Sequence, residues 1–503
     1  MDRMRDFDPF AASIFAGNEY MGVAGAGSLQ VDNPSTLEPV GRIAIVPAVA
    51  LEEILVRSRL AQKAWARIPV KERAARLHEV AHSLKSRSCQ RVCELLTREM
   101  GKPFPESEGE VRNVAPIFEY YAELAKDHAG SVAGTIQPGN LQFKRYDPYG
   151  VSAHILPYNY PLLIMAFTVA ASLAAGNAVV IKPSPVTSLS TLAFMEHFRS
   201  LPAGLVTCLT GDGSVGRCLV ESPRTDVVAF TGSAEVARTV AVACAQRMKP
   251  CVIEAGGNDP IIVSDRADAD FAAAAVTCSS FHLSGQICTS TERVFVVEGI
   301  YDEFMRRFVD RVSKLRVGDG LGKSEIGPLA TRALRDRIAG LVARAVEQGA
   351  IVETGGRIPP ERPTGWFYEP TVLSNVRPEM EIMQDEIFGP VAPVCRVRSV
   401  PEGIEFANRS KYGLGASIIT TDLAEAMLAI EELDSGMVWV NNPMVDNDAL
   451  PFGGRKMSGL GRELGREGLD AFRQVKFVTL DPTQKPSDWW YPYPDSAFHR
   501  ADG

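Results

Sequence analysis

Ser284-Gly285-Gln286-Ile287-Cys288-Thr289 is the stretch on which the interpretation of the whole chain depends. It places one cysteine in a short, glycine-containing segment, between a helical pattern that ends near Leu283 and a strand pattern that begins near Glu292. A thiolate is the strongest common protein nucleophile near neutral pH, and a cysteine on such a turn is reachable by a substrate. The alternative is an inert cysteine in the core, because cysteine is among the most buried residue types.

Short apolar strands alternate with helices on both sides of this stretch. Before it, strands are predicted at 151–156, 178–181, 206–210, 227–230 and 251–253, and helices at 162–174, 187–199, 214–221 and 234–247. A second block has predicted strands at 261–263, 294–297 and 416–420 and long helices at 268–283 and 301–315. Such alternation predicts an α/β fold with doubly wound, open parallel sheets, whose ligands bind at the carboxyl ends of the strands.

The segments that flank these two blocks have different sequence patterns. Residues 1–40 are rich in Gly, Pro, Asn and Ser and predict an irregular segment, and three helices with an apolar face follow, the last ending at Gly101. Polar-alternating runs between Thr135 and Tyr149 flank Pro138-Gly139-Asn140, which predicts a hairpin, and a strand pattern recurs at 475–478. We expect these distant strands to pair and to reach a neighbouring subunit, and the aromatic tail Trp489-Trp490-Tyr491-Pro492-Tyr493 to pack on its own or a partner subunit.

Length and composition set limits on the protein class. A chain of 503 residues is too long for one core, so two or three domains are expected. The formal net charge of -8 is spread along the chain and argues against nucleic acid or a membrane as the main partner. The nine cysteines are scattered and include no Cys-x-x-Cys, which is typical of a reduced, cytoplasmic protein and predicts neither disulfides nor a metal site.

Two loops are candidates for binding a phosphate. Gly211-Asp212-Gly213-Ser214-Val215-Gly216 follows a strand and opens a helix, but no acidic residue ends a strand about twenty positions later, as a dinucleotide fingerprint requires. In Phe230-Thr231-Gly232-Ser233-Ala234, Gly232 lets the backbone approach a ligand and Ser233 can donate to a phosphate oxygen, although a plain helix cap has the same pattern. Lys182 ends the second strand and can bind ribose hydroxyls or a 2′-phosphate, with a solvated charge as its alternative.

Three more polar side chains could take part in chemistry. Glu254 ends the fifth strand in apolar surroundings, where desolvation raises the pKa of a carboxyl group toward that of a general base. Its alternative is a structural carboxylate that accepts from the following glycine turn. Asn159 can offer its amide to a developing oxyanion, or can simply form a turn. Glu386 precedes an aromatic turn and says little alone.

Taken together and in this order, these stretches resemble the aldehyde dehydrogenase superfamily over about residues 30–480. The resemblance rests on Pro157-Tyr158-Asn159-Tyr160-Pro161, Lys182-Pro183-Ser184, Phe230-Thr231-Gly232-Ser233, Glu254-Ala255-Gly256-Gly257, Gly285-Gln286-Ile287-Cys288, Glu386-Ile387-Phe388-Gly389-Pro390 and Pro451-Phe452-Gly453-Gly454. It implies a dinucleotide-binding domain at 1–129 and 149–256, a catalytic domain at 257–458, oligomerisation strands at 130–148 and 472–482, and a tail at 483–503. It also implies a homodimer or homotetramer.

The resemblance implies a mechanism as well. The Cys288 thiolate attacks the aldehyde carbon, the Asn159 amide and the Cys288 N–H hold the oxyanion, and hydride leaves for a nicotinamide ring. Glu254 then activates the water that hydrolyses the thioester. The implied cofactor residues are Glu386 for the nicotinamide ribose, Lys182 for the adenosine ribose, Gly232 and Ser233 for the pyrophosphate, and Pro157, Ser184 and Phe388 around them. The loop at Gly211 is then not the phosphate loop.

The expected cofactor is NAD or NADP. Members of the superfamily that prefer NAD usually carry a glutamate three residues after the lysine, where it accepts from the ribose 2′-OH. Here that position is Pro185, which removes both the acceptor and the repulsion of a 2′-phosphate. We therefore expect NADP to be tolerated.

Positions near the superfamily's substrate tunnel predict an apolar or aromatic aldehyde; they are Tyr160, Ile164, Phe167, Ile287, Thr289 and Phe452. No arginine falls among them, which disfavours an aldehyde that bears a carboxylate or phosphate. The acidic loop Val445-Asp446-Asn447-Asp448 would suit a cationic aminoaldehyde, with solvated charge as its alternative.

Three alternatives stay open at this point. A coenzyme-A-acylating dehydrogenase of the same fold needs no water-activating base, so Glu254 argues for hydrolysis. A thiol hydrolase that pairs Cys288 with His154 or His282, or a non-catalytic scaffold, would need neither Lys182 nor Glu386.

Overall fold

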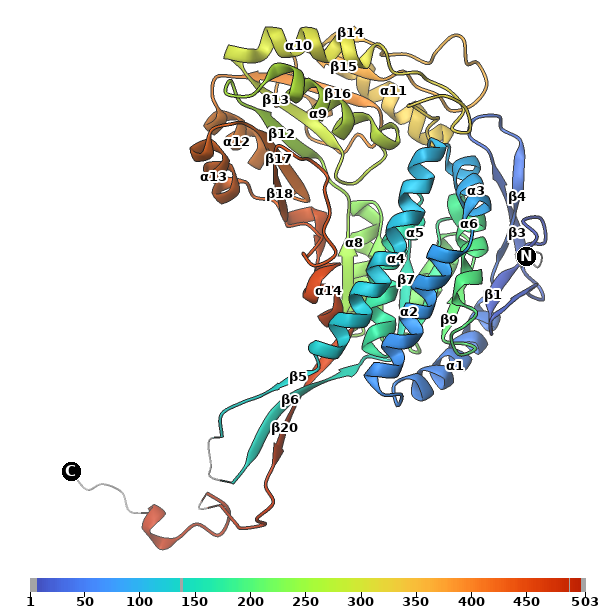
Figure 1. The fold of residues 1–503 in the computed structure, drawn as a ribbon, viewed down its shortest axis with the longest axis vertical. Helices are drawn as coiled ribbons and strands as arrows, with labels where there is room; N and C mark the ends of the chain where they lie inside the picture. The colour runs from blue at the N-terminus through green and yellow to red at the C-terminus, as the bar shows by residue number, and fades with distance from the viewer. Residues whose placement is uncertain (1–6, 136–138, 488, 499–503) are drawn as a thin grey trace.

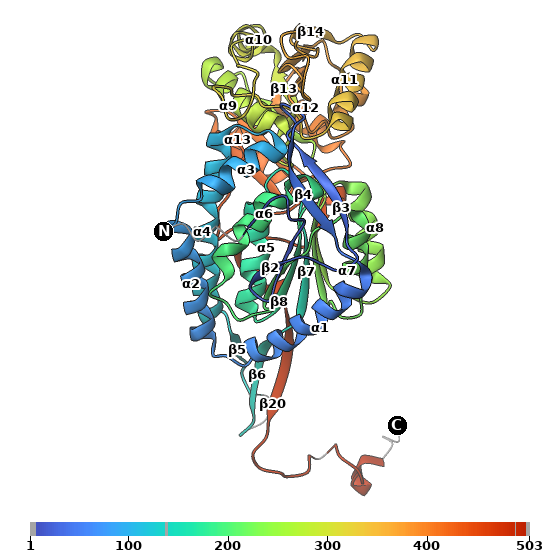
Figure 2. The same cartoon turned by 90° about the vertical axis from the view of Figure 1, so that its right-hand side faces the viewer.

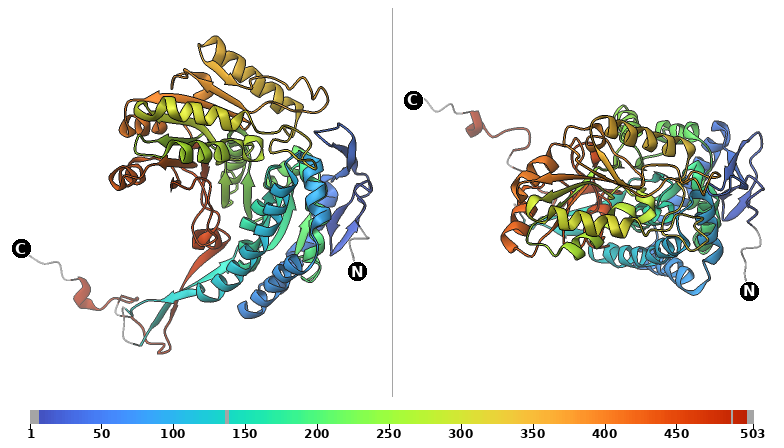
Figure 3. Two further views of the ribbon diagram at one scale, coloured as in Figure 1. Left: turned by 45° about the horizontal axis from the view of Figure 1, so that its top comes forward. Right: turned by 90° about the horizontal axis from the view of Figure 1, so that it is seen from above.

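The computed structural model describes residues 7–135, 139–487 and 489–498. A sheet of eight strands and a sheet of seven strands form the two main layers, and a narrow arm of three strands projects from the end of the first layer (Figure 1). With the top of the molecule turned forward, the two layers and the projecting arm can again be told apart (Figure 3, left). The predicted α/β fold with two open, mainly parallel sheets and a small β arm is confirmed.

The first sheet contains the predicted run of five parallel strands at its centre. In spatial order its strands are β19 (Gly459–Leu460), β11 (Cys251–Glu254), β10 (Val227–Thr231), β7 (Val151–Ile155), β8 (Ala178–Lys182), β9 (Val206–Cys208), β1 (Ile14–Ala16) and β2 (Glu19–Met21). The chain runs outward from β7 through β8 to β9 and then returns to β10 on the other side. The carboxyl ends of β7 and β10 therefore flank a topological switch point, where such sheets bind ligands.

Helices cover both faces of the first sheet (Figure 2). One face is covered by α2 (Val70–Ser86), α3 (Gln90–Met100), α4 (Phe104–Asp127), α5 (Pro161–Ala175) and α6 (Ser188–Phe194), and the other by α1 (Ala48–Trp65), α7 (Gly213–Glu221) and α8 (Ala234–Ala245). Successive strand residues point to opposite faces, so Val227 and Ala229 pack in one core and Val228 and Phe230 in the other. Burial on both faces explains why these strands are apolar throughout.

The second sheet is larger than its sequence pattern predicts. In spatial order it contains β14 (Ile351–Thr354), β15 (Thr371–Ser374), β16 (Val391–Val397), β13 (Thr291–Val297), β12 (Asp259–Val263), β17 (Gly415–Ile419) and β18 (Met437–Val440). Its helices are α9 (Ala269–Phe281) and α10 (Glu298–Val312) on one face, and α11 (Arg332–Glu347), α12 (Val400–Asn408) and α13 (Leu423–Glu432) on the other. The short helix α14 (Gly465–Asp470) returns to the first layer and packs on α5.

Three expectations about local structure are wrong. Residues 7–40, the described part of the segment expected to be irregular, contain regular strands, because β1 and β2 form a hairpin around Gly17-Asn18 and β3 (Gly27–Asp32) pairs with β4 (Pro39–Ile45). Gly17 and Asn18 both have positive φ, at 63° and 69°, which is the backbone of a two-residue hairpin turn. The predicted helix at 187–199 is α6 flanked by two 3-10 turns, and the helix at 268–283 ends two residues early, at Phe281.

The arm is a small antiparallel sheet in the order β20 (Arg473–Leu480), β6 (Leu141–Pro148) and β5 (Gly130–Val132). The predicted pairing of the two distant segments is confirmed, but the first hairpin strand lies before Thr135, and Pro138 in the predicted turn lies outside the described residues. The tail beyond β20 extends away from the body (Figure 1), and Trp489 and Tyr491 are exposed. The expected packing of this tail on its own subunit is therefore absent among the described residues.

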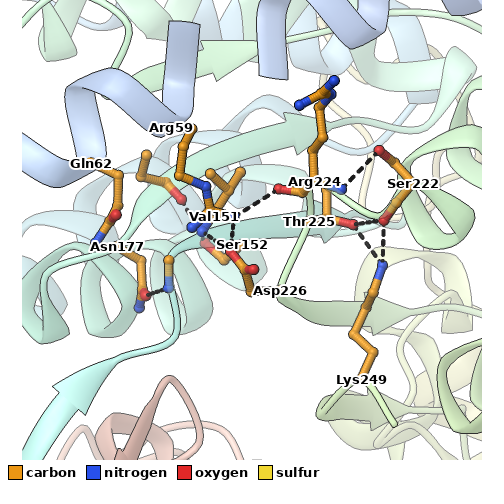
Figure 4. A network of polar contacts seen from close by, with 12 residues as sticks. Arg59, Gln62, Val151, Ser152, Asn177, Ser222, Arg224, Thr225, Asp226 and Lys249 are labelled. Atoms are coloured by element: carbon orange, nitrogen blue, oxygen red, sulfur yellow. Dashed lines mark hydrogen bonds and ion pairs between the residues drawn. The ribbon is translucent and has the colours of Figure 1, made fainter. Parts of the chain in front are cut away.

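The opposite end of the first sheet, where its strands begin, is held by a polar network (Figure 4). Asp226 accepts from the Val151 N–H at 2.6 Å and pairs with Arg59 of α1, while Asn177 accepts from the Gly150 N–H at 2.7 Å. Lys249 donates to the Val220 and Ser222 carbonyls and to the Thr225 hydroxyl. These bonds satisfy strand and helix ends far from the switch point, so this network is structural.

Among the helices that the structure describes, none is both long enough and apolar enough to cross a bilayer.

Candidate active site

Cys288 is held at the junction of the two layers by an unusual turn. After α9 ends, Leu283, Ser284 and Gly285 all have positive φ, at 54°, 55° and 71°. A Cβ on Gly285 would lie 2.1 Å from the Gly389 carbonyl oxygen, so only glycine allows this close approach. The turn thereby presses the cysteine segment against the loop that contains Glu386.

The side chains of Cys288 and Glu254 lie close enough for each to shift the pKa of the other. Both are buried, with 9% of Cys288 and 2% of Glu254 exposed, and one Glu254 oxygen has no hydrogen-bond partner. Burial raises the pKa of Glu254 to about 7, and the nearby Cys288 side chain acts in the opposite direction. The pKa of the Cys288 thiol is raised well above its usual value, mainly by burial and secondly by the negative charge of Glu254. The Cys288 thiol therefore stays protonated near neutral pH, beside a carboxyl group whose ionised form can accept its proton.

Two sets of hydrogen bonds hold Glu386 in place: one to its own side chain, and one that fixes the backbone just after it. A Cβ on Gly256, whose φ is 73°, would lie 2.4 Å from a Glu386 oxygen, and the Gly257 N–H donates to the same oxygen at 3.0 Å. Glu292 accepts from the N–H groups of Ile387 and Phe388, at 2.7 and 2.6 Å. Burial, followed by the nearby Glu292 charge, raises the pKa of Glu386 well above its usual value. The site thus contains several buried carboxyl groups close to Cys288.

Asn159 lies in the turn between β7 and α5, and only 2% of its surface is exposed. Its backbone carbonyl accepts a hydrogen bond from the Lys102 ammonium at 2.8 Å. The next residue, Tyr160, reaches the cavity that also contains the Cys288 side chain. On the other side, the Tyr158 ring packs edge-on against Phe388, with centroids 6.0 Å apart.

A cavity of about 820 Å³ opens onto Cys288. All the residues predicted for the substrate pocket line it: Tyr160, Ile164, Phe167, Ile287, Thr289 and Phe452. The rings of Phe167 and Phe452 lie 5.7 Å apart and form an aromatic wall.

Charged side chains also line this cavity, and those of α4 are not revealed by the sequence pattern. Glu106 of α4 pairs with His282 at 3.2 Å, while its second oxygen is buried without a hydrogen-bond partner. Asp446 and Asp448 line the cavity from the acidic loop. Arg112 of α4 lies on its wall too, so the expectation that no arginine borders the substrate region is wrong. Arg112 is exposed and also borders a neighbouring cavity.

The residues predicted to bind a cofactor lie at carboxyl ends of strands in the first sheet or on the Glu386 loop. Lys182 ends β8 and is buried, which lowers its pKa to about 8. Gly232 and Ser233 precede α8, and the Ser233 side chain makes no capping bond to that helix, so its hydroxyl and the first N–H groups of α8 can receive a pyrophosphate. Ser184 accepts from the Val186 N–H at 3.3 Å. The buried carboxyl groups around Cys288 would stabilise a cationic nicotinamide ring, so these residues fit the predicted cofactor.

The glycine-rich loop at Gly211 has another role. Asp212 caps α7 by accepting from the Ser214 N–H at 2.9 Å, which is an ordinary cap. Asp212 lies close enough to Lys182 for their charges to interact.

A doubly wound dinucleotide sheet that opens onto a buried cysteine paired with a carboxyl group defines an enzyme of cofactor-dependent thiol chemistry. The chain belongs to the aldehyde dehydrogenase family, whose pattern it matches over residues 23–478. It is an NAD(P)-dependent aldehyde dehydrogenase.

Relatives and solved structures match nearly the whole chain. A chloroplastic aminoaldehyde dehydrogenase of Arabidopsis thaliana is 36% identical, over 92% of this chain and 94% of that protein. A glutarate-semialdehyde dehydrogenase of Pseudomonas aeruginosa is 33% identical, over 95% and 99%. Betaine aldehyde dehydrogenase of Staphylococcus aureus, solved with NAD⁺, has a TM-score of 0.92 at 29% identity, over 96% and 99%. An NADP dependent enzyme of E. coli has a TM-score of 0.91 at 32% identity, over 94% and 98%.

Proposed function

We propose that this protein oxidises its aldehyde to the free carboxylic acid with Cys288 as nucleophile and Glu254 as general base. The observation that carries the proposal is the proximity of these two buried side chains, with Cys288 on the wall of the cavity. Glu254 accepts the thiol proton, and the thiolate adds to the aldehyde carbon to give a thiohemiacetal. The Asn159 amide and the Cys288 N–H stabilise its oxyanion.

The second half of the reaction releases the acid. Bound NAD(P)⁺ would supply the hydride acceptor, and loss of hydride from the thiohemiacetal carbon leaves a thioester on Cys288. Glu254 first releases the thiol proton to solvent and then takes a proton from water, whose oxygen attacks the thioester. As the carbon–sulfur bond breaks, Glu254 returns this proton to the Cys288 sulfur, so that the acid and the free thiol are released. The residues that would hold the cofactor are Lys182, Ser184, Gly232, Ser233 and Glu386, with Pro157 and Phe388 beside them.

Free acid as the product separates this proposal from acyl transfer to coenzyme A. We expect the product to be the acid alone, whether or not coenzyme A is present, and chromatography of the products measures this. Acyl-CoA formed at a rate comparable to that of aldehyde oxidation would contradict the proposed role of Glu254. A thiol hydrolase with His154 as base is disfavoured, because both ring nitrogens of His154 are bonded at 2.8 Å, one to Ser152 and the other to Thr168.

We expect Pro185→Glu to shift cofactor use toward NAD. Pro185 follows the strand end that carries Lys182, and no carboxylate at this position repels a 2′-phosphate. The substituted glutamate would repel that phosphate and accept from the 2′-OH of NAD, so kcat/KM for NADP should fall by about 10-fold or more relative to NAD. Steady-state kinetics of both variants with both cofactors measure the ratio. Complete inactivity of the unsubstituted enzyme with NADP would contradict the expected tolerance.

For the substrate we propose an aldehyde with an apolar chain that ends in a cationic amine. The aromatic wall suits the chain, as the sequence pattern predicts, and the carboxyl groups of Glu106, Asp446 and Asp448 suit the amine. The unpartnered Glu106 oxygen is the strongest support, because a buried acceptor without a donor is costly. Arg112 is exposed and also borders another cavity, so we expect its guanidinium group to face solvent and not to bind the substrate.

Glu106→Gln should raise KM for 4-aminobutanal by about 10-fold, since it removes one charge-assisted hydrogen bond, and should leave kcat nearly unchanged. The matched control is pentanal, an uncharged aldehyde of similar length, whose KM should not change. Arg112→Ala should affect neither substrate. If succinic semialdehyde were the better substrate and Arg112→Ala raised its KM, the amine assignment would be wrong.

We further propose that the arm forms a homo-oligomer, a dimer or a tetramer, in the cytoplasm. Apolar side chains of the arm are exposed to solvent in the single chain; they are Val132, Leu141, Val475, Phe477 and Leu480. Exposed apolar side chains on a small sheet whose outer strands are β20 and β5 favour pairing with a second copy, and sedimentation of the chain in solution tests it. All nine cysteines are free thiols, in keeping with a reducing compartment.

A further inference from the structure

Lys102 and Glu110 form an ion pair inside the molecule, and neither side chain has any exposed surface. Lys102 lies in the short connection between α3 and α4, and Glu110 lies in the second turn of α4. Removing two charges from water costs several kcal/mol per ion, so such a pair is a poor source of stability compared with apolar residues of the same size. The positions of its other contacts indicate a different role.

The pair contacts both sides of the turn that contains Asn159. The Lys102 ammonium donates to the Asn159 carbonyl at 2.8 Å and lies 4.7 Å from the centre of the Tyr160 ring. One Glu110 oxygen accepts from the N–H groups of Leu162 and Leu163, at 2.7 and 3.1 Å. These two are among the unpaired N–H groups in the first turn of α5, so Glu110 serves as the cap of that helix.

The same connection touches the segment that contains Cys288. A Cβ on Gly320 would lie 2.3 Å from the Lys102 carbonyl oxygen, and a Cβ on Gly327 would lie 2.0 Å from that of Gly101. The Gly327 carbonyl accepts from the Ser284 hydroxyl at 3.0 Å, in the turn just before Cys288. A continuous series of contacts thus joins the Cys288 segment, through Gly327 and Lys102, to Asn159.

We propose that the Lys102–Glu110 ion pair positions the Asn159 turn relative to Cys288, so that the amide is in place when the oxyanion forms. Lys102 and Glu110 are positioning residues, since their charged groups act through the backbone of 159–163. This inference rests on the proposed oxyanion role of Asn159. It gives a physical reason for a buried ion pair where apolar side chains would fill the same space.

The test is the double variant Lys102→Met/Glu110→Gln, which removes both charges and keeps an acceptor for α5. We expect kcat to fall by about 100-fold, the order of loss that a misplacement of about 1 Å causes, with KM for the cofactor unchanged. The midpoint of thermal unfolding should stay the same or rise. Glu110→Gln alone is the milder second variant. Lys85→Met, which breaks the exposed Lys85–Glu119 ion pair, is the matched control and should leave kcat unchanged.

A double-mutant cycle distinguishes positioning from a general structural effect. In an Asn159→Ala background, removal of the ion pair should lower kcat by less than about threefold, because residues that act through a shared partner are not additive. A full 100-fold further loss in that background, or an unchanged kcat in the wild-type background, would overturn the inference. If Asn159→Ala itself left kcat unchanged, the oxyanion role would fail first, and the cycle would show which of the two claims is wrong.

Discussion

Cys288→Ser is expected to lower kcat for aldehyde oxidation by about 10⁴- to 10⁶-fold, the range for loss of a catalytic nucleophile. Serine keeps the shape of cysteine, but its hydroxyl ionises far less readily, and a carboxylate with a pKa of about 7 is too weak a base to activate it. Binding of the cofactor, measured by calorimetry, should not change, because Lys182, Ser233 and Glu386 are untouched.

The matched control is Cys278→Ser. Cys278 lines the same cavity and is more exposed than Cys288, but Glu254 is not among the groups that shift its pKa. We expect this variant to keep nearly full activity. Equal loss in both variants would mean that the cavity tolerates no substitution, and the nucleophile would remain unassigned.

Glu254→Gln is expected to separate the two halves of the reaction. Hydrolysis of the thioester should slow by about 10²- to 10⁴-fold, the contribution of a general base. Formation of the thioester should slow less, because water can take the thiol proton in place of Glu254, so the first turnover still produces reduced cofactor. Stopped-flow absorbance should show a burst close to one equivalent per active site, followed by slow turnover. A burst slowed as much as the steady state would instead assign Glu254 to thiol activation alone.

The pH dependence of this step follows from the same carboxyl group. Burial raises the pKa of Glu254 to about 7, and only the ionised form can accept a proton from water. The rate of thioester hydrolysis should therefore rise as pH increases through about 7 and level off above it. In Glu254→Gln that rise should be absent.

The parts of the fold that could be predicted are those with a strong local pattern. Strands β7, β8, β9, β10 and β11 are apolar on both faces and alternate with helices, and all five lie where expected. Helix α4 was not predicted, because Pro105 and Gly109 near its start and Pro116 in its interior are typical of loops. The hairpin of β1 and β2 is too short for a period to show, although Gly17-Asn18 is a turn signal.

The residues of the site also divide into those that a local sequence pattern reveals and those that only the fold brings together. Motifs in a fixed order led to Cys288 and Glu254, and the structure brings these two together. Glu106 and Arg112 line the cavity only because α4 passes beside it, which no local pattern in the sequence reveals. The Lys102–Glu110 pair depends on tertiary contacts in the same way, since its partners lie some fifty residues further along the chain.

The most direct test of the proposed chemistry is mass spectrometry of Glu254→Gln quenched in acid after one turnover with aldehyde and NAD(P)⁺. The account predicts an acyl group, the aldehyde less one hydrogen, on the peptide that contains Cys288, and its disappearance on treatment with hydroxylamine. An unmodified Cys288 peptide after a full burst, or an acyl group on the Cys278 side chain instead, would contradict it.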